Sequence, residues 1–118
     1  MIGSTRAVRV WARRGPTDLR LGYDGLYGLV VRELKQDPLG GDLFLFVNRT
    51  RRSAKVLLWD GTGLCLYAKR LSRGQFACLW TPPGVGDLRL TLAELALFLE
   101  GARLTEKTPR SPQEVVCR

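Results

Sequence analysis

The 118-residue chain contains no histidine. Because histidine is the commonest general base near neutral pH and the commonest zinc ligand, its absence removes the usual basis for both kinds of chemistry. No apolar run approaches the ~20 residues needed to cross a bilayer. The first residues also lack the apolar core of a signal peptide. We therefore expect a cytoplasmic protein with no membrane partner.

The three cysteines, Cys65, Cys78 and Cys117, are odd in number and show no Cys-x-x-Cys spacing. This pattern gives no metal or redox motif. Cys65 and Cys78 lie within apolar runs, where reduced and buried thiols are the usual case. We expect both to be buried free thiols.

Acidic residues are scarce, with 11 Asp and Glu against 19 Lys and Arg. A metal-dependent strand-transfer site would need about three clustered carboxylates. Asp18 and Asp60 are the pair that could share a metal, but turn aspartates usually only shape the backbone. We expect a protein that is not an enzyme, with no catalytic residue, metal site, cofactor or small-molecule substrate.

Three apolar runs separated by two short polar turns occupy the middle of the chain, at residues 43–47, 56–59 and 64–68. Each run has strand length and is bounded by turn residues. The second turn, residues 60–63, supplies the glycines that a tight hairpin needs. Because strand side chains alternate, Leu45 and Val47 share one face while Phe44 and Phe46 share the other. Both faces are apolar, so both must be covered.

The flanking segments predict further elements. Residues 7–13 alternate like a half-buried strand, and Thr17 or Asp18 is placed to cap a helical turn. Gly22 interrupts, and Asp24 can cap a helix that continues to about Gln36. Residues 75–80 and 85–90 predict two more strands, the second at a sheet edge. Thr91 and Glu94 form a capping box for a second helix that Gly101 ends.

These elements predict an α+β fold. An antiparallel meander of about four to six strands, either open or curled toward a barrel, packs with two helices. We expect residues 1–101 to form this single domain. The segment 102–118 has two prolines, mixed charge and little apolar content, so we expect a mobile C-terminal tail.

The net charge of +8 favours a polyanionic partner, with nucleic acid first and an anionic membrane surface second. A solvated basic surface is the alternative. A two-stranded ribbon fits the major groove of DNA, and basic side chains on it would mostly contact phosphates. Arg20 is expected to pair with Asp18. The predicted nucleic-acid-binding residues are the cations at the strand ends and turns, namely Arg13, Arg14, Arg49, Arg51, Arg52, Lys55, Lys69, Arg70 and Arg73.

An ordered series of short motifs runs through the chain. It includes Thr17-Asp18-Leu19-Arg20, Asp37-Pro38, Leu43-Phe44-Leu45-Phe46, Trp59-Asp60-Gly61, Lys69-Arg70-Leu71 and Arg73-Gly74-Gln75-Phe76. In this series the chain resembles the small TnpB-type accessory protein encoded by insertion sequences of the IS-sixty-six family. The resemblance covers roughly residues 3 to 101. It does not extend to the RNA-guided nucleases that share the TnpB name, because this chain is far too short and lacks their acidic motifs.

The resemblance implies a transposition helper encoded beside a separate, large transposase. Its expected partners are DNA at the ends of the element, and the transposase or another helper. If the protein is instead a non-catalytic adaptor that docks on the transposase, an exposed apolar patch is needed. Trp80 beside Pro82 and Pro83 is the candidate for that patch, although packing in the core also explains it. DNA binding would weaken steeply with salt, and an apolar interface would not.

Overall fold

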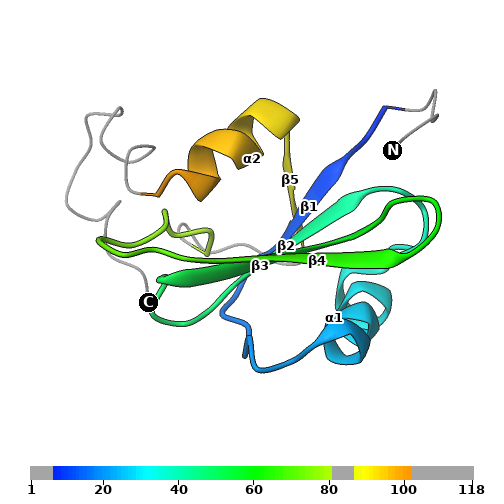
Figure 1. The fold of residues 1–118 in the computed structure, drawn as a ribbon, viewed down its shortest axis with the longest axis horizontal. Coiled ribbons are helices and arrows are strands. Elements are labelled where there is room, and N and C mark those ends of the chain that lie inside the picture. The colour runs from blue at the N-terminus through cyan, green and yellow to red at the C-terminus, as the bar shows by residue number, and fades with distance from the viewer. Residues whose placement is uncertain (1–6, 81–86, 102–118) are drawn as a thin grey trace.

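The computed structural model describes residues 7–80 and 87–101, so the predicted tail at 102–118 and the turn at 81–84 lie outside the described residues. Five strands form one open sheet (Figure 1). They are β1 (Val10–Arg13), β2 (Leu43–Val47), β3 (Ser53–Trp59), β4 (Leu64–Arg70) and β5 (Asp87–Leu90). The sheet order is β4-β3-β2-β1-β5.

The sheet is mixed, not purely antiparallel as the sequence suggested. The meander β2-β3-β4 is antiparallel as predicted, and β5 pairs antiparallel with β1. However, β1 lies parallel to β2, with Ala12 beside Leu45. A parallel neighbour requires a long crossover, and the chain from residue 14 to residue 42 provides it through a helix. The sheet does not curl, because β4 and β5 remain separate edges.

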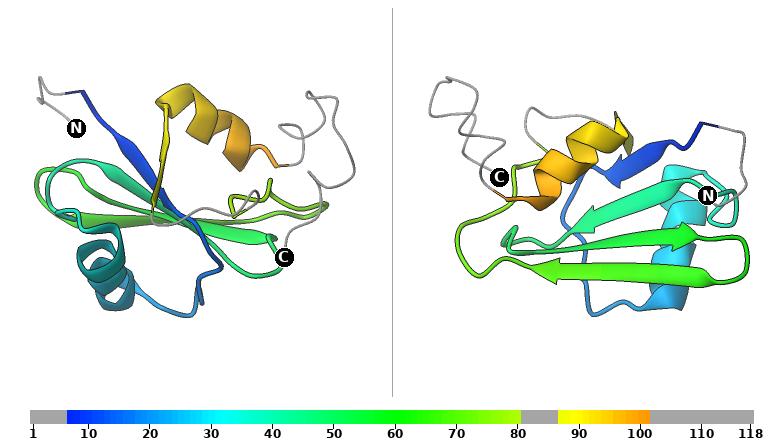
Figure 2. Two further views of the ribbon diagram at one scale, coloured as in Figure 1. Left: turned by 180° about the vertical axis from the view of Figure 1, so that it is seen from behind. Right: turned by 45° about the horizontal axis from the view of Figure 1, so that its top comes forward.

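The two faces of the sheet carry two separate cores. Helix α1 (Tyr23–Leu29) continues as a short π-helical stretch, η1 (Val30–Leu34), and covers the face that buries Phe44 and Phe46. Helix α2 (Leu92–Leu99) covers the face that buries Leu45 and Val47. The views in Figure 2 show the two helices on opposite sides of the sheet. The prediction that both faces of the central strands are buried is therefore confirmed.

The helix ends differ in how well the sequence predicted them. The capping box of α2 is present, since Thr91 Oγ1 accepts from the Glu94 N–H at 3.0 Å and Glu94 Oε1 accepts from the Thr91 N–H at 2.8 Å. Gly101 follows this helix with φ +98°. At α1 the predicted cap by Asp24 is wrong, because Gly22 is the N-cap and it has no capping side chain. Asp18 begins a separate turn before Gly22, as predicted: its Oδ1 accepts from the Arg20 N–H at 3.0 Å and its carbonyl accepts from the Leu21 N–H at 3.2 Å.

The predicted strand at residues 75–80 is wrong. This segment is irregular, yet Phe76, Ala77 and Leu79 are buried in the α2-side core. The ring of Phe76 stacks on Phe98 of α2, with centroids 5.0 Å apart. Tertiary packing thus replaces the sheet pairing that the apolar run suggested.

The thiol prediction is also wrong. Cys65 is a free thiol, but it is only partly buried on the edge strand β4. Cys78 is disulfide-bonded. An apolar neighbourhood in the sequence does not reveal that β4 is an edge strand with less cover than β2 or β3.

Candidate nucleic-acid interface

The topology gathers most of the predicted basic residues at one end of the sheet. Strands β1, β2 and β4 finish at this end and β3 begins there, as the right-hand view of Figure 2 shows. In the register, Ser53 at the start of β3 pairs with Arg70 at the end of β4. We call this end of the sheet, with the β2–β3 turn and the segments that follow β1 and β4, the basic end.

Five arginines at the basic end have side chains with no hydrogen bond or ion pair to any residue that the structure describes. They come from the segment after β1, the β2–β3 turn, the end of β4 and the following loop, and they are Arg14, Arg49, Arg52, Arg70 and Arg73. Strands β1 and β4 are three strand spacings apart, or about 14 Å. We call these five residues the open arginines.

Two further predicted arginines are held by neighbouring groups. Arg13 Nε donates to Glu33 Oε1 at 2.9 Å, and its Nη1 donates to the Pro16 carbonyl at 2.6 Å. Arg51, which has φ +60°, donates from Nη1 to the Phe76 carbonyl at 3.0 Å. Partial burial lowers the pKa of Arg51, although arginine stays protonated in proteins. These two side chains hold loops in place.

The two predicted lysines also hold the fold. Lys55 Nζ donates to the Leu19 carbonyl at 2.8 Å, which fastens the segment before α1 beneath β3. Lys69 Nζ donates to the Leu99 carbonyl at 2.5 Å, at the C-terminal end of α2, where a cation is favourable. A carbonyl carries no net charge, so these bonds do not cancel the charge of either lysine. Among the nine predicted residues, only Arg13 is paired with a carboxylate within the described ranges.

The β2–β3 turn that carries Arg49 and Arg52 is built on one amide. Asn48 Oδ1 accepts from the N–H groups of Arg52 and Ser53, both at 3.1 Å. The loop after β4 is then fastened to this turn, since the Leu71 N–H donates to the Arg52 carbonyl at 2.8 Å and the Phe76 N–H donates to the Arg51 carbonyl at 2.7 Å. The open arginines therefore project from a backbone with many fixed contacts.

Asp18 adds a carboxylate to the basic end, but an arginine already occupies it. Arg20 donates to both Asp18 oxygens, with the shortest contact 2.8 Å from Nη2 to Oδ2. These side-chain bonds, with the Arg20 backbone N–H, lower the pKa of Asp18 from 3.8 to about 2. The predicted pairing of Arg20 with Asp18 is confirmed. Asp18 is therefore ionised at neutral pH, and Arg20 offsets its charge.

At the opposite end of the sheet, carboxylates accept hydrogen bonds from neighbouring groups. Asp60 closes the β3–β4 turn, where its Oδ1 accepts from the N–H groups of Thr62 and Gly63, both at 2.9 Å. These bonds lower the pKa of Asp60 from 3.8 to about 2. Burial and the neighbouring Asp60 raise the pKa of the Cys65 thiol. Asp42, buried just before β2, accepts from Trp11 Nε1 at 3.1 Å.

Asp18 and Asp60 do not meet, so the shared metal site considered from the sequence is not formed. They lie near opposite ends of β3, a seven-residue strand that at ~3.3 Å per residue is about 20 Å long. Within residues 7–80 and 87–101 no group of three metal-ligating side chains comes together. Neither α1 nor α2 has the length and apolar character to cross a membrane.

Trp11, Trp59 and Tyr67, aromatic residues on which unpaired bases could stack, are not at the basic end. Trp11 is covered by the Arg89 guanidinium, 4.9 Å from its ring centroid, and donates to Asp42. Trp59 ends β3 beside the opposite turn. Tyr67 is 49% exposed in the middle of the edge strand β4. Trp80, the residue considered for an adaptor surface, packs against the α2-side core.

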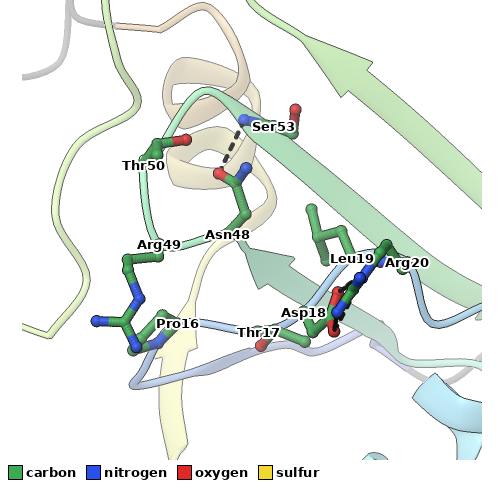
Figure 3. Close-up of a pocket in the computed structure, with 9 residues that line it drawn as sticks. All are labelled: Pro16, Thr17, Asp18, Leu19, Arg20, Asn48, Arg49, Thr50 and Ser53. Carbon is green, nitrogen blue, oxygen red and sulfur yellow. Dashed lines mark hydrogen bonds and ion pairs between the residues drawn. The ribbon is translucent and has the colours of Figure 1, made fainter.

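A hollow of about 630 Å³ lies at the basic end, between the segment 16–20 and the β2–β3 turn (Figure 3). Asn48, Thr50 and Ser53 line it from the turn, and the Asp18–Arg20 pair lines it from the segment before α1. In Figure 3 the Asp18–Arg20 pair and Arg49 lie on different sides of the hollow. None of the three neutral residues was predicted from the sequence. The signal for Asn48 was present, because asparagine after an apolar run is typical of a turn.

The chain belongs to a known family. Residues 8–109 match the family model described as IS66 Orf2 like protein. The protein is therefore an accessory protein associated with an insertion sequence, and the resemblance inferred from the residues is confirmed.

Two relatives come from Sinorhizobium fredii. The uncharacterized protein y4hO is 41% identical over 101 residues, which cover 86% of each chain. The uncharacterized protein y4jC is 33% identical over 118 residues, which cover 98% of this chain and 99% of the relative. No solved structure matches the chain.

Proposed function

We propose that this accessory protein acts in transposition by binding duplex DNA through the basic end. The observation that carries the proposal is the convergence of the five open arginines, from segments as far apart in sequence as Arg14 and Arg73, without acidic partners among the described residues. Two nearby carboxylates, Asp18 and Glu33, are each bonded to another arginine. Asp87 begins β5 opposite Arg13, and Glu100 follows Leu99, whose carbonyl accepts from Lys69. Positive charge without local neutralisation attracts polyanions.

The dimensions of the basic end suit a DNA groove. Strands β1 and β4, which the outermost open arginines follow or end, are about 14 Å apart, close to the ~12 Å width of the major groove. Arginines at the two sides can contact phosphates on both strands, while the β2–β3 turn lies between them. Such contacts position a protein on DNA without reading sequence. The proposal therefore predicts binding to the ends of the element and to unrelated duplexes alike.

The fixed backbone also supports the proposal. Arg51, Lys55 and Lys69 hold the loops of the basic end through bonds to neutral carbonyls. Their charges therefore add to the positive field, although their donors are already used. We assign phosphate contact first to the open arginines. For the other four predicted residues, DNA contact stays a prediction.

A salt titration of DNA binding tests the proposal. Each neutralised phosphate contributes about −0.9 to the slope of log K against log salt, so five contacts predict a slope of about −4.5. The double variant Arg49→Gln/Arg52→Gln should flatten the slope by about 1.8 on both the element end and an unrelated duplex. Arg32→Gln/Lys35→Gln removes the same charge from exposed positions on and just after η1, and should keep the wild-type slope.

Failure of the wild-type protein to bind either duplex at low salt would overturn the proposal. A salt-insensitive association with the transposase would then favour the adaptor function. No apolar patch at Trp80 supports that second function, because Trp80 packs against the core.

A further inference from the structure

The hollow beneath the β2–β3 turn continues into a second one. Leu19 and Ser53 line both, and the second hollow, about 330 Å³, extends along β3 and β4 to Arg70. Together they form a trough that runs from Arg49 to Arg70 across the ends of β2, β3 and β4. The trough lies on the side where the segment before α1 passes beneath the sheet.

The trough offers neutral hydrogen-bond donors. The hydroxyls of Thr50 and Ser53 have no hydrogen bond to a described residue, although both residues are fixed through their backbones. Asn48 uses its carbonyl oxygen for the turn, so its NH₂ group remains a donor with no partner inside the described ranges. The Asn48 NH₂ group requires an acceptor from a ligand, and the two hydroxyls can donate to one as well.

The charges of the residues that line the trough favour an anionic ligand. Arg49 and Arg70 stand at the two ends of the trough, and Lys55 lies along the second part. The ammonium of Lys69 is turned to the opposite face of the sheet, where it donates to Leu99 of α2. Asp18 is the single carboxylate among the lining residues, and Arg20 occupies both of its oxygens. Neither hollow is lined by an aromatic residue, so unpaired bases have no surface on which to stack. A phosphodiester backbone within a duplex meets all three conditions.

We propose that this trough holds the phosphodiester backbone of one strand of duplex DNA. Asn48, Thr50 and Ser53 donate to its phosphate oxygens between the charged contacts of Arg49 and Arg70. The inference rests on the proposed function and deepens it, because it assigns neutral contacts that do not depend on salt.

The test separates neutral contacts from charged ones. Thr50→Val/Ser53→Ala removes two hydroxyls without changing the charge, so DNA affinity should fall about tenfold while the salt slope stays that of wild type. Arg49→Gln should instead flatten the slope by about 0.9. Thr62→Val is the matched control, since it removes a hydroxyl from the turn at the opposite end and should keep wild-type affinity. Thermal melts establish that each variant is folded.

The outcomes distinguish the two proposals. Wild-type affinity of Thr50→Val/Ser53→Ala, with flattened slopes for the arginine variants, would overturn the trough and leave the basic end as the DNA site. Absence of wild-type binding to any duplex would overturn both. Tighter binding of a single strand of equal length that depends on the same hydroxyls would overturn the duplex assignment. If Ser53→Ala melts early, Thr50→Val alone gives the answer, because Thr50 is exposed.

Discussion

The β2–β3 turn and the β3–β4 turn lie at opposite ends of β3, and each begins with a side chain that accepts backbone N–H groups. The two side chains, an Asn and an Asp, differ in charge. At the basic end, the neutral Asn48 accepts from two backbone N–H groups at 3.1 Å. At the opposite end, the ionised Asp60 accepts from two at 2.9 Å. Turn formation requires an acceptor and not a charge. The basic end thus gains its turn without placing a carboxylate beside Arg49 and Arg52.

The cations follow the same division. Arg51, Lys55 and Lys69, which hold the fold, bond to neutral carbonyls, while Arg13 also bonds to the Glu33 carboxylate. The open arginines have no such partner among the described residues. The carboxylates of the opposite end are used locally, by the β3–β4 turn and by Trp11. At the opposite end of the sheet, the polar groups therefore form hydrogen bonds with one another. At the basic end, there are more hydrogen-bond donors than acceptors.

The largest expected effect is on the free energy of unfolding, when removal of a lysine that holds the basic end is compared with removal of an open arginine. Lys55→Met leaves the carbonyls of Leu19 and Leu21 without this donor, and hydrogen bonds to a charged group are worth about 1.5–3 kcal/mol. We expect the free energy of unfolding to fall by about 2 kcal/mol. Arg49→Met should change it by less than about 0.5 kcal/mol. Urea titrations measure both, and equal effects would contradict the division.

An intermediate effect, on duplex DNA affinity, is expected when the neutral turn residue of the basic end is replaced by the aspartate found in the opposite turn. Asn48→Asp keeps an acceptor for both N–H groups, so the fold should be retained at neutral pH. The new charge would repel phosphate, since like charges about 4 Å apart cost ~1 kcal/mol in water and more near a protein. We expect duplex DNA affinity to fall about tenfold at low salt.

The reciprocal change is the control for this substitution. Asp60→Asn adds one positive charge at the opposite end and should leave duplex affinity close to wild type. Loss of affinity in Asp60→Asn, or wild-type affinity in Asn48→Asp, would argue that the two ends do not differ in function.

The smallest effect concerns acid stability. The folded pKa of Asp60 is about 2, below the ordinary 3.8, because two backbone N–H groups stabilise the carboxylate. Its contribution to stability is therefore present above about pH 4 and is lost as the pH falls toward 2. Asp18, with the same shift, behaves in the same direction. Thermal melts between pH 4 and pH 2 should show a weaker pH dependence for Asp60→Asn than for wild type. An unchanged dependence would remove Asp60 from this account.

The sequence predicted the parts of the fold that depend on local pattern. The meander, the two-sided burial of Phe44 and Leu45, and the capping box at Thr91 are all determined by neighbours in the chain. The parallel pairing of β1 with β2 was missed, because it depends on how a long crossover returns to the sheet. The strand predicted at 75–80 failed for a similar reason, since Phe76 packs on Phe98 of the following helix, 22 residues later in the chain.

The candidate site was predicted as a set of residue types and not as a geometry. Charge pattern selected nine cations, but it could not separate Lys55 from Arg49. The partners of Lys55 are carbonyls more than 30 residues away in sequence. The charge pattern also could not select Thr50 or Ser53, because only the fold shows that these two neutral residues line a hollow.

The central claim is that one end of the sheet meets DNA and the other does not. Backbone amide chemical shifts of the full 118-residue protein, recorded while a short duplex is added at low salt, test it most directly. The account predicts shifts concentrated at residues 14–20, 48–53 and 70–76, with residues 60–63 unchanged. Shifts centred on residues 60–63, or spread evenly over both ends, would contradict it.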